Sequence, residues 1–165
     1  KLASEHYLRI YQSRGLEPTS LRIANVYGPG QNLTNLKQGM VSIYLAQMIK
    51  NGKIIVKGSA QRFRDFIYIE DVVNSTLSLL QNDKSIGSIF NIGTGIKTTV
   101  RELLEKLINI YGKDVKIEYT DPTPGDQMGI YADNSKIKNH LSIDQYVRID
   151  VGLKKMLDWA INLSS

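Results

Sequence analysis

The feature that most constrains the fold of this chain is the alternation of helix-like and strand-like segments along its length. Apolar residues recur at helical spacing in segments that we expect to be helices over residues 1–14, 40–50, 70–80, 100–111, 134–141 and 151–161. Between them lie short runs rich in β-branched and aromatic residues, which predict strands over residues 20–26, 54–56, 66–69, 89–92 and 115–119. Alternating helices and strands indicate an α/β layer structure.

Local signals mark the ends of several of these elements. Gly52 is expected to close the second helix, because glycine readily takes the left-handed conformation of a helix C-cap. Thr98 or Thr99 is expected to cap the helix that follows them. No residue before Leu2 can cap the first helix, so we expect that the chain has been cut from a longer protein.

Composition excludes several classes of function. The sequence has no cysteine, so disulfides and thiolate metal sites are excluded, and a cytoplasmic location is expected. No apolar run approaches the ~20 residues of a membrane span, so no membrane partner is expected. The net charge of +5 comes from scattered basic residues rather than a cluster, which argues against nucleic acid as a partner.

Common catalytic motifs are missing from the sequence. It contains no P-loop, no metal-ligand cluster and no nucleophile elbow, so no metal is expected. His6 and His140 are far apart, and both are expected to lie on polar helix faces without a chemical role. The Gly93–Gly95 segment lacks the third glycine of a dinucleotide-binding loop, so it is interpreted as a tight turn after a strand.

Four other residues are candidates whose role the residues alone leave open. Arg62 and Arg64 flank a short aromatic strand, and they either grip a phosphate or pair with a surface carboxylate. Asn25 follows the first predicted strand, where it either faces a ligand crevice or satisfies a turn. Asp126 lies in a proline-containing loop, where it either binds a ribose diol or completes ordinary turn chemistry.

Taken in order, five segments resemble one family, the extended short-chain dehydrogenases/reductases of the nucleotide-sugar epimerase/dehydratase kind. Residues 1–5 resemble the end of the Tyr-x-x-x-Lys motif and its helix, and residues 21–30 (LRIANVYGPG) resemble Leu-Arg-x-x-Asn-x-Tyr-Gly-Pro. Residues 64–73 (RDFIYIEDVV) are similar to Arg-Asp-Phe-x-Tyr-Val-x-Asp-Val. Residues 90–95 and 124–136 match the later landmarks, so the resemblance covers essentially the whole chain.

The resemblance implies an NAD-dependent enzyme that acts on a nucleoside-diphosphate sugar, similar to UDP-glucose 4-epimerase, through a 4-keto intermediate. Lys1 would be catalytic together with a tyrosine that this chain lacks, and it would bind the nicotinamide ribose. Ala24 and Val26 would bind the cofactor beside its nicotinamide. The implied substrate-binding residues are Asn25, Met40, Lys57, Arg64 and Asp126. A homodimer, formed through a helix bundle that includes residues 1–11, is the expectation for the family.

The resemblance also implies a fold, namely the C-terminal part of an extended short-chain dehydrogenase, with a Rossmann-like parallel sheet and a smaller α/β substrate-binding lobe. Residues 1–25 would end the NAD-binding region, and 26–165 would form mainly the substrate lobe, with 70–93 returning to the Rossmann region. The chain departs from the family where Thr123 replaces an arginine before Pro-Gly-Asp. Loss of this cation puts the usual uridine nucleotide in question, although Arg62 or Lys57 could compensate.

Two alternatives to an epimerase stay open at this point. A nucleotide-sugar 4,6-dehydratase of the dTDP-glucose type would need an acidic pair that precedes the catalytic tyrosine, outside this chain. A non-catalytic nucleotide-binding module would explain why the chain has no complete cofactor site. In either enzyme, the chain alone is expected to be inactive and to expose apolar surface, so that it self-associates.

Overall fold

Short parallel strand pairs form the framework of the computed structural model, which describes residues 1–35, 37, 39–122, 125 and 127–164. The parallel pairs are β1 (Ser20–Ile23) with β6 (Ile89–Ile92), β2 (Asn25–Tyr27) with β5 (Phe66–Tyr68), and β3 (Lys53–Lys57) with β8 (Lys116–Thr120). A further small sheet has β4 (Phe63–Arg64) at its centre, between β7 (Thr98–Thr99) and β9 (Gly129–Ile130).

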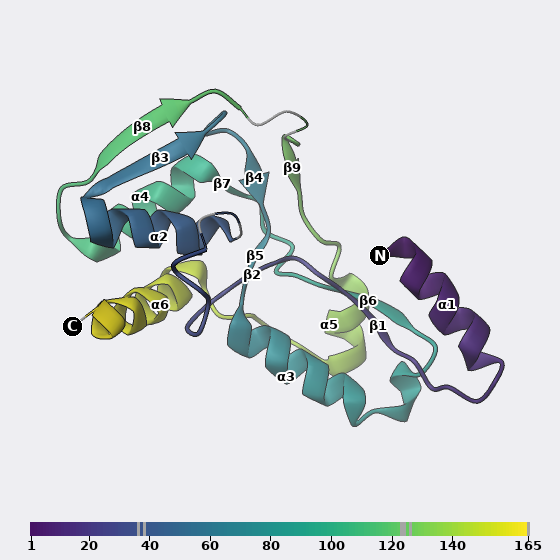
Figure 1. Cartoon of the computed structure of the whole chain (residues 1–165). Coiled ribbons are helices and arrows are strands. Elements are labelled where there is room, and N and C mark those ends of the chain that lie inside the picture. The colour runs from purple at the N-terminus through teal and green to yellow at the C-terminus, as the bar shows by residue number, and fades with distance from the viewer. Residues whose placement is uncertain (36, 38, 123–124, 126, 165) are drawn as a thin grey trace.

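Helices cover these strands in two lobes (Figure 1). The helices are α1 (Leu2–Gln12), α2 (Met40–Asn51), α3 (Ile69–Leu80), α4 (Val100–Tyr111), α5 (Ser135–Leu141) and α6 (Ile149–Ser164), and a 3₁₀ turn, η1, spans Asp83–Ser85. The predicted α/β class is confirmed, and each predicted helix is present with bounds close to those expected. Gly52 is the left-handed C-cap of α2, and Thr99 rather than Thr98 caps α4.

The prediction of one continuous strand over residues 20–26 is wrong. The run divides at Ala24, because β1 pairs with β6 whereas β2 pairs with β5. The Ala24 N–H donates to the Ile92 carbonyl at 2.8 Å, and the next amide, that of Asn25, donates to the Asp65 carbonyl at 2.9 Å. The chain therefore changes its pairing partner between two adjacent residues.

Two hydrophobic cores meet at the β2–β5 pair. Phe66 and Tyr68 face the first core, which lies among α2, α4, α6 and β3, while Ile67 faces the second core with α3, β6 and α5. Successive side chains of a strand point to opposite faces, so a strand between two cores must be apolar on both. All three residues of β5 are accordingly buried.

The two cores lie in the two lobes that Figure 1 displays, with α2, α4 and α6 in one and α3 and α5 in the other. The predicted division into a Rossmann region and a substrate lobe stays a prediction. If that division holds, α5 packs with the Rossmann part, since Ile137 belongs to the second core. None of the helices in the described part of the chain has the length and apolar composition of a bilayer-spanning segment.

Helix α1 contributes no buried side chain, and it lies at the edge of the second lobe (Figure 1). A bidentate ion pair joins it to β1, with both Arg22–Glu5 nitrogen–oxygen distances at 2.7 Å. His6 is exposed on this helix, as expected. The expectation of a polar face is wrong for His140, whose ring lies 4.9 Å from the Phe90 ring and contacts the Ser85 hydroxyl at 2.9 Å, so that it ties α5 to η1.

Candidate functional site

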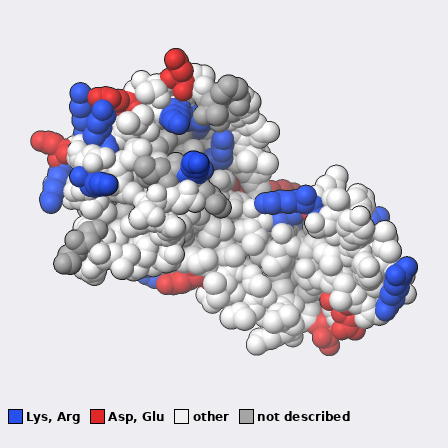
Figure 2. Space-filling model, viewed as in Figure 1, with Lys and Arg blue, Asp and Glu red and all other residues white. Residues whose placement is uncertain are grey.

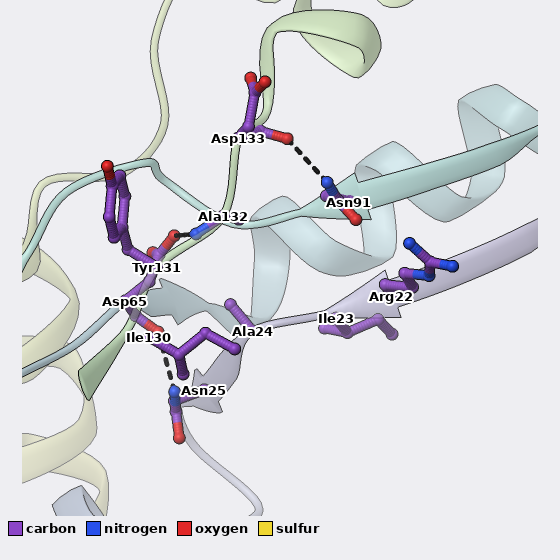
Figure 3. A pocket seen from close by; sticks show the side chains of 10 residues that line it. All are labelled: Arg22, Ile23, Ala24, Asn25, Asp65, Asn91, Ile130, Tyr131, Ala132 and Asp133. Atoms are coloured by element: carbon purple, nitrogen blue, oxygen red, sulfur yellow. Dashed lines mark hydrogen bonds between the residues drawn. The ribbon is translucent and has the colours of Figure 1, made fainter. Parts of the chain in front are cut away.

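Two cavities adjoin at Asn25, which lines both of them. The smaller cavity, of about 420 Å³, lies at the carboxyl end of β1 (Figure 3). The larger cavity, of about 670 Å³, lies between α2 and β3. Their position follows from the fold, because open α/β sheets bind ligands beyond the carboxyl ends of their parallel strands. The change of pairing partner at Ala24 is what brings Asn25 between them.

The smaller cavity has one wall from β1 and β6 and another from the segment that follows β9. The first wall includes Arg22, Ala24 and Asn91, and the second runs from Ile130 to Asp133. The Asn91 side chain donates to the Asp133 carbonyl at 2.9 Å, which holds the two walls together (Figure 3). The hydrogen bonds to Glu5 raise the pKa of Arg22, and the charge of this guanidinium is balanced by the Glu5 carboxylate.

A buried carboxylate, Asp65, forms the back of the smaller cavity and is only 1% exposed. One oxygen accepts from the Thr94 amide at 2.8 Å and the Thr94 hydroxyl at 2.6 Å. The other oxygen accepts from the amides of Gly95 at 2.9 Å and Ala132 at 3.1 Å. A buried charge is tolerated only when it is fully hydrogen-bonded, and here four donors satisfy it.

This arrangement explains the Gly93–Gly95 segment. Its amides point at a protein carboxylate, so they are not available to a dinucleotide phosphate. The interpretation of this segment as a turn rather than a dinucleotide-binding loop is confirmed. Gly93 is required by close packing, because a Cβ there would lie 2.5 Å from an Asp65 carboxylate oxygen and 2.7 Å from the Ala132 Cβ.

The larger cavity is lined by the cations Lys37, Lys57 and Arg62, with no carboxylate among its lining residues in the described chain. Figure 2 shows Lys and Arg side chains grouped over the lobe that contains α2 and β3. The Arg62 guanidinium donates to the Ser59 carbonyl at 3.0 Å and to the Lys57 carbonyl, so it also braces the turn after β3. A cavity of this charge favours an anionic ligand.

Apolar and amide groups complete the larger cavity. Met40, Ile43 and Tyr44 come from one side of α2, and Ile55 comes from β3. The Gln47 side chain accepts from the Ile55 amide at 2.8 Å, which fixes α2 against the strand. The combination of apolar and cationic lining residues suits a ligand with a planar apolar part and a phosphate.

Several predicted substrate-binding residues come together in the larger cavity, namely Asn25, Met40 and Lys57. Arg64 does not line it. The Arg64 guanidinium donates to the Phe63 carbonyl at 2.8 Å and to the Gln127 carbonyl at 3.2 Å. Asp126 lies outside the described residues, as does Thr123.

The predicted cofactor residues are only partly brought to a cavity by the structure. Ala24 and Val26 both pack against the second core, and of the two Ala24 lines the smaller cavity. Lys1 is exposed at the N-cap of α1 and is absent from the lining of both cavities in the described chain. The binding roles of all these residues stay predictions. Within the same described ranges, no three His, Asp or Glu side chains gather as a metal site would require.

Among the residues that shape the two cavities and that sequence reasoning missed are Lys37, Asp65 and Asn91. Asp65 carries a signal that could have been used, because a carboxylate next to the apolar run of residues 66–69 is expensive to bury unless it accepts several hydrogen bonds. Lys37 and Asn91 carry no such local signal. Their place depends on which distant segments fold against them.

The chain is similar to one family model and to several solved structures. Residues 1–93 match the model of the NAD dependent epimerase/dehydratase family. The crystal structure of UDP-glucose 4-epimerase with UDP-glucose from Thermotoga maritima superposes with a TM-score of 0.93 at 32% identity, over 100% of this chain and 53% of that one. The UDP-glucuronic acid 4-epimerase of Bacillus cereus, in complex with UDP-glucuronic acid and NAD, gives a TM-score of 0.88 at 27% identity, over 99% of this chain and 51% of that one.

A curated relative with a different activity is also similar. The dTDP-4-dehydro-6-deoxyglucose reductase of Escherichia coli is 33% identical over 95% of this chain and 49% of its own length. The chain thus spans about half the length of the proteins it matches. These relatives bear out the expectation of a Rossmann-like fold.

Proposed function

Because the chain belongs to the NAD-dependent epimerase/dehydratase family, we propose that the full-length protein is an NAD-dependent epimerase of a nucleoside-diphosphate sugar. UDP-glucose is the type of substrate that we favour. The observation that carries the proposal is the adjoining pair of cavities at Asn25, one lined by cations and the other at the carboxyl end of the parallel strands. A nucleoside-diphosphate sugar requires an anion site for its diphosphate, here the larger cavity, beside a reaction chamber for its sugar, here the smaller cavity.

The ligand would lie across both cavities. Lys37 and Lys57 would hold the diphosphate, while the base would enter the apolar slot beside Met40 and Ile55. The sugar would then extend past Asn25 into the smaller cavity, where the small side chain of Ala24 would leave room for the sugar ring. The support for this placement is the common wall at Asn25 and the charge of the larger cavity.

The cofactor would approach the smaller cavity from the half of the protein that precedes this chain. NAD, when bound, supplies a hydride acceptor for the carbon that is inverted. Lys1 would bind the nicotinamide ribose and, as a cation, lower the pKa of the neighbouring catalytic tyrosine, which then takes the proton of the sugar 4-hydroxyl. Return of hydride and proton to the opposite face of the 4-keto sugar would complete the inversion.

A reaction on a dTDP-sugar is the second candidate, and the 33% identity to a dTDP-sugar reductase favours it. The 4,6-dehydratase reaction belongs with this candidate, because it also begins with oxidation at C4. In either case the chain of residues 1–165 alone would bind nucleotide but would not turn over substrate, since it lacks the tyrosine and most of the cofactor site. A module that binds nucleotide without catalysis would leave the full-length protein inactive as well.

The deciding experiment is an assay of the full-length protein with UDP-galactose and with dTDP-glucose, combined with calorimetric titration of UDP, dTDP and NAD. We expect NAD binding, UDP binding and interconversion of UDP-galactose with UDP-glucose. Turnover of dTDP-glucose to a 4-keto-6-deoxy sugar would favour the dehydratase instead. Nucleotide binding with turnover of neither sugar would contradict both enzymes and favour the non-catalytic module.

Substitution of Lys57→Ala tests the anion site directly. We expect UDP affinity of the full-length protein to fall about tenfold, since a charge-assisted hydrogen bond contributes roughly 1.5 kcal/mol. Lys53→Ala is the matched control on the same strand, because Lys53 pairs with Glu118 on β8 at 2.6 Å and is not among the residues that line the cavity. Equal losses in the two variants, or no loss at Lys57→Ala, would rule out the proposed diphosphate site.

A further inference from the structure

Asp65 joins parts of the chain that are far apart in sequence, and it does so with both its carboxylate and its backbone carbonyl. Its carboxylate takes donors from the Gly93–Gly95 turn and from Ala132, which lie in separate segments. Its carbonyl takes the Asn25 amide at 2.9 Å and the Asn25 side-chain Nδ2 at 3.3 Å (Figure 3). Asp65 therefore forms the back of the smaller cavity and also holds Asn25, the residue that lines both cavities.

The packing around this carboxylate leaves no room for adjustment. A Cβ on Gly93 would lie 2.5 Å from the Asp65 carboxylate, 2.7 Å from the Ala132 Cβ and 3.1 Å from the Ala24 Cβ. Segments that contain Asp65, Ala24 and Ala132 thus converge on Gly93 at contact distance. The Asp65 carboxylate also accepts from the Ala132 amide, so its displacement acts directly on Ala132 and, through the packing at Gly93, on Ala24, and both of these residues line the smaller cavity.

The larger cavity is independent of these contacts over most of its surface. Lys37, Met40 and Gln47 lie on α2 or just before it, and Lys57 lies at the end of β3. Helix α2 is held to β3 by Gln47 and by the first hydrophobic core, in which Asp65 takes no part. Loss of the Asp65 carboxylate should therefore distort the smaller cavity while the anion site stays intact.

We propose that Asp65 is a positioning residue that fixes the reaction chamber relative to the nucleotide site, a role that rests on the proposed function. It acts through Asn25 and the Gly93–Gly95 turn and does not touch the reacting atoms. Positional errors of about 1 Å can reduce turnover on the order of 10²-fold without loss of substrate binding. The charge is essential to this role, because an amide in its place would direct an NH₂ group at backbone N–H donors.

The test is Asp65→Asn in the full-length protein, read by kcat, by UDP affinity and by the amide resonances of Thr94 and Gly95. We expect kcat for the nucleotide sugar to fall on the order of 10²-fold while the dissociation constant of UDP is unchanged. The two amide resonances should shift, because they lose a carboxylate acceptor. The UDP titration also counts folded binding sites, so kcat is expressed per competent molecule.

Two further variants keep the test decisive. Gly93→Ala retains the carboxylate but displaces it, so it should produce the same selective loss of kcat even if Asp65→Asn does not fold. Glu118→Gln removes a partly exposed carboxylate that pairs with Lys53 and Lys116 and lines neither cavity, and it should change none of the three readouts.

The outcomes separate this inference from the proposed function. The positioning role would be overturned if kcat were unchanged in both Asp65→Asn and Gly93→Ala, or if kcat and UDP affinity fell in parallel. In either case, turnover of a nucleotide sugar by the wild-type protein would still support the proposed function. If the wild-type protein turns over no nucleotide sugar, the proposed function fails and the kinetic role of Asp65 fails with it. The Thr94 and Gly95 resonances would then still report whether the carboxylate holds the turn.

Discussion

At the scale of single residues, Gly152 lies within α6 at a point where helix propensity and packing oppose each other. Alanine is ordinarily favoured over glycine in a helix interior by ~1 kcal/mol. Here an added methyl group would overlap the Tyr27 hydroxyl and lie 2.9 Å from the Tyr68 Cδ2. Both rings are buried at the β2–β5 pair, so neither can move aside easily.

We therefore predict that Gly152→Ala destabilises the protein by about 2 kcal/mol, the usual effect of overpacking a filled core. Thermal and urea unfolding of the full-length protein would measure the change. In Tyr27→Phe the hydroxyl is gone, and with it a long 3.4 Å hydrogen bond to the Ile149 carbonyl. The double variant Tyr27→Phe/Gly152→Ala should recover part of the loss. A stabilised Gly152→Ala protein would mean that α6 has room to shift.

At the scale of an element, α4 shows how the local sequence determines where a helix begins and where it ends. The Thr99 hydroxyl accepts from the Glu102 amide at 3.1 Å, and the Glu102 carboxylate accepts from the Thr99 amide at 2.7 Å, which forms a complete capping box. Gly112, in the left-handed conformation at φ 69°, ends the helix. Between the two ends, α4 buries Leu103, Leu104 and Leu107 against the first core.

Thr99→Ala should lower the free energy of unfolding by about 1 kcal/mol near neutral pH. The hydrogen bonds from the Thr99 amide and hydroxyl hold the pKa of Glu102 below its ordinary value. This stabilisation is present above the ordinary glutamate pKa and is lost as the pH falls through the lowered one. The difference between wild type and variant should therefore shrink between about pH 7 and about pH 3, as measured by urea unfolding.

A substitution on a different helix supplies the control for this capping prediction. Ser78→Ala removes a hydroxyl from the exposed side of α3 and should change stability little at either pH. A difference between wild type and Thr99→Ala that stays constant over the acid range would show that Glu102 does not take part in the cap in solution.

At the scale of the whole molecule, two cores meet at one strand pair, and apolar side chains remain exposed on the outer helices. On α1 these are Leu2, Tyr7, Ile10 and Tyr11, and on α3 they are Val73, Leu77 and Leu80. Apolar stripes of this kind are typical of surfaces that pack against another part of a protein or a partner subunit.

Residues 1–165 expressed alone should associate in a concentration-dependent way, which sedimentation velocity would detect. Tyr7→Ser/Ile10→Ser should weaken this association, because it removes apolar area from α1. Tyr119→Ser, which removes a comparably exposed ring on β8, serves as the control and should have little effect. A monomer at all concentrations would contradict the interpretation of α1 as a covered surface. The family expectation of a homodimer through this helix stays a prediction.

The sequence by itself determined the helices, their caps and the α/β class. These depend on interactions within a few residues, such as the Thr99–Glu102 box and the left-handed turn at Gly52. The family resemblance also identified Asn25, Met40 and Lys57, which the structure places around one cavity. Local periodicity and short motifs carry that information because neighbouring residues are always close in space.

Only the tertiary structure decided where the chain changes strand partner and what Asp65 binds. The run divides at Ala24 because β1, before it, pairs with β6, whereas β2, after it, pairs with β5. The donors to Asp65 come from Thr94, Gly95 and Ala132, and Arg64 turns toward Gln127 rather than into the cavity. A backbone amide has no residue-specific signature, so a site built from distant amides is defined only once the fold has brought them together.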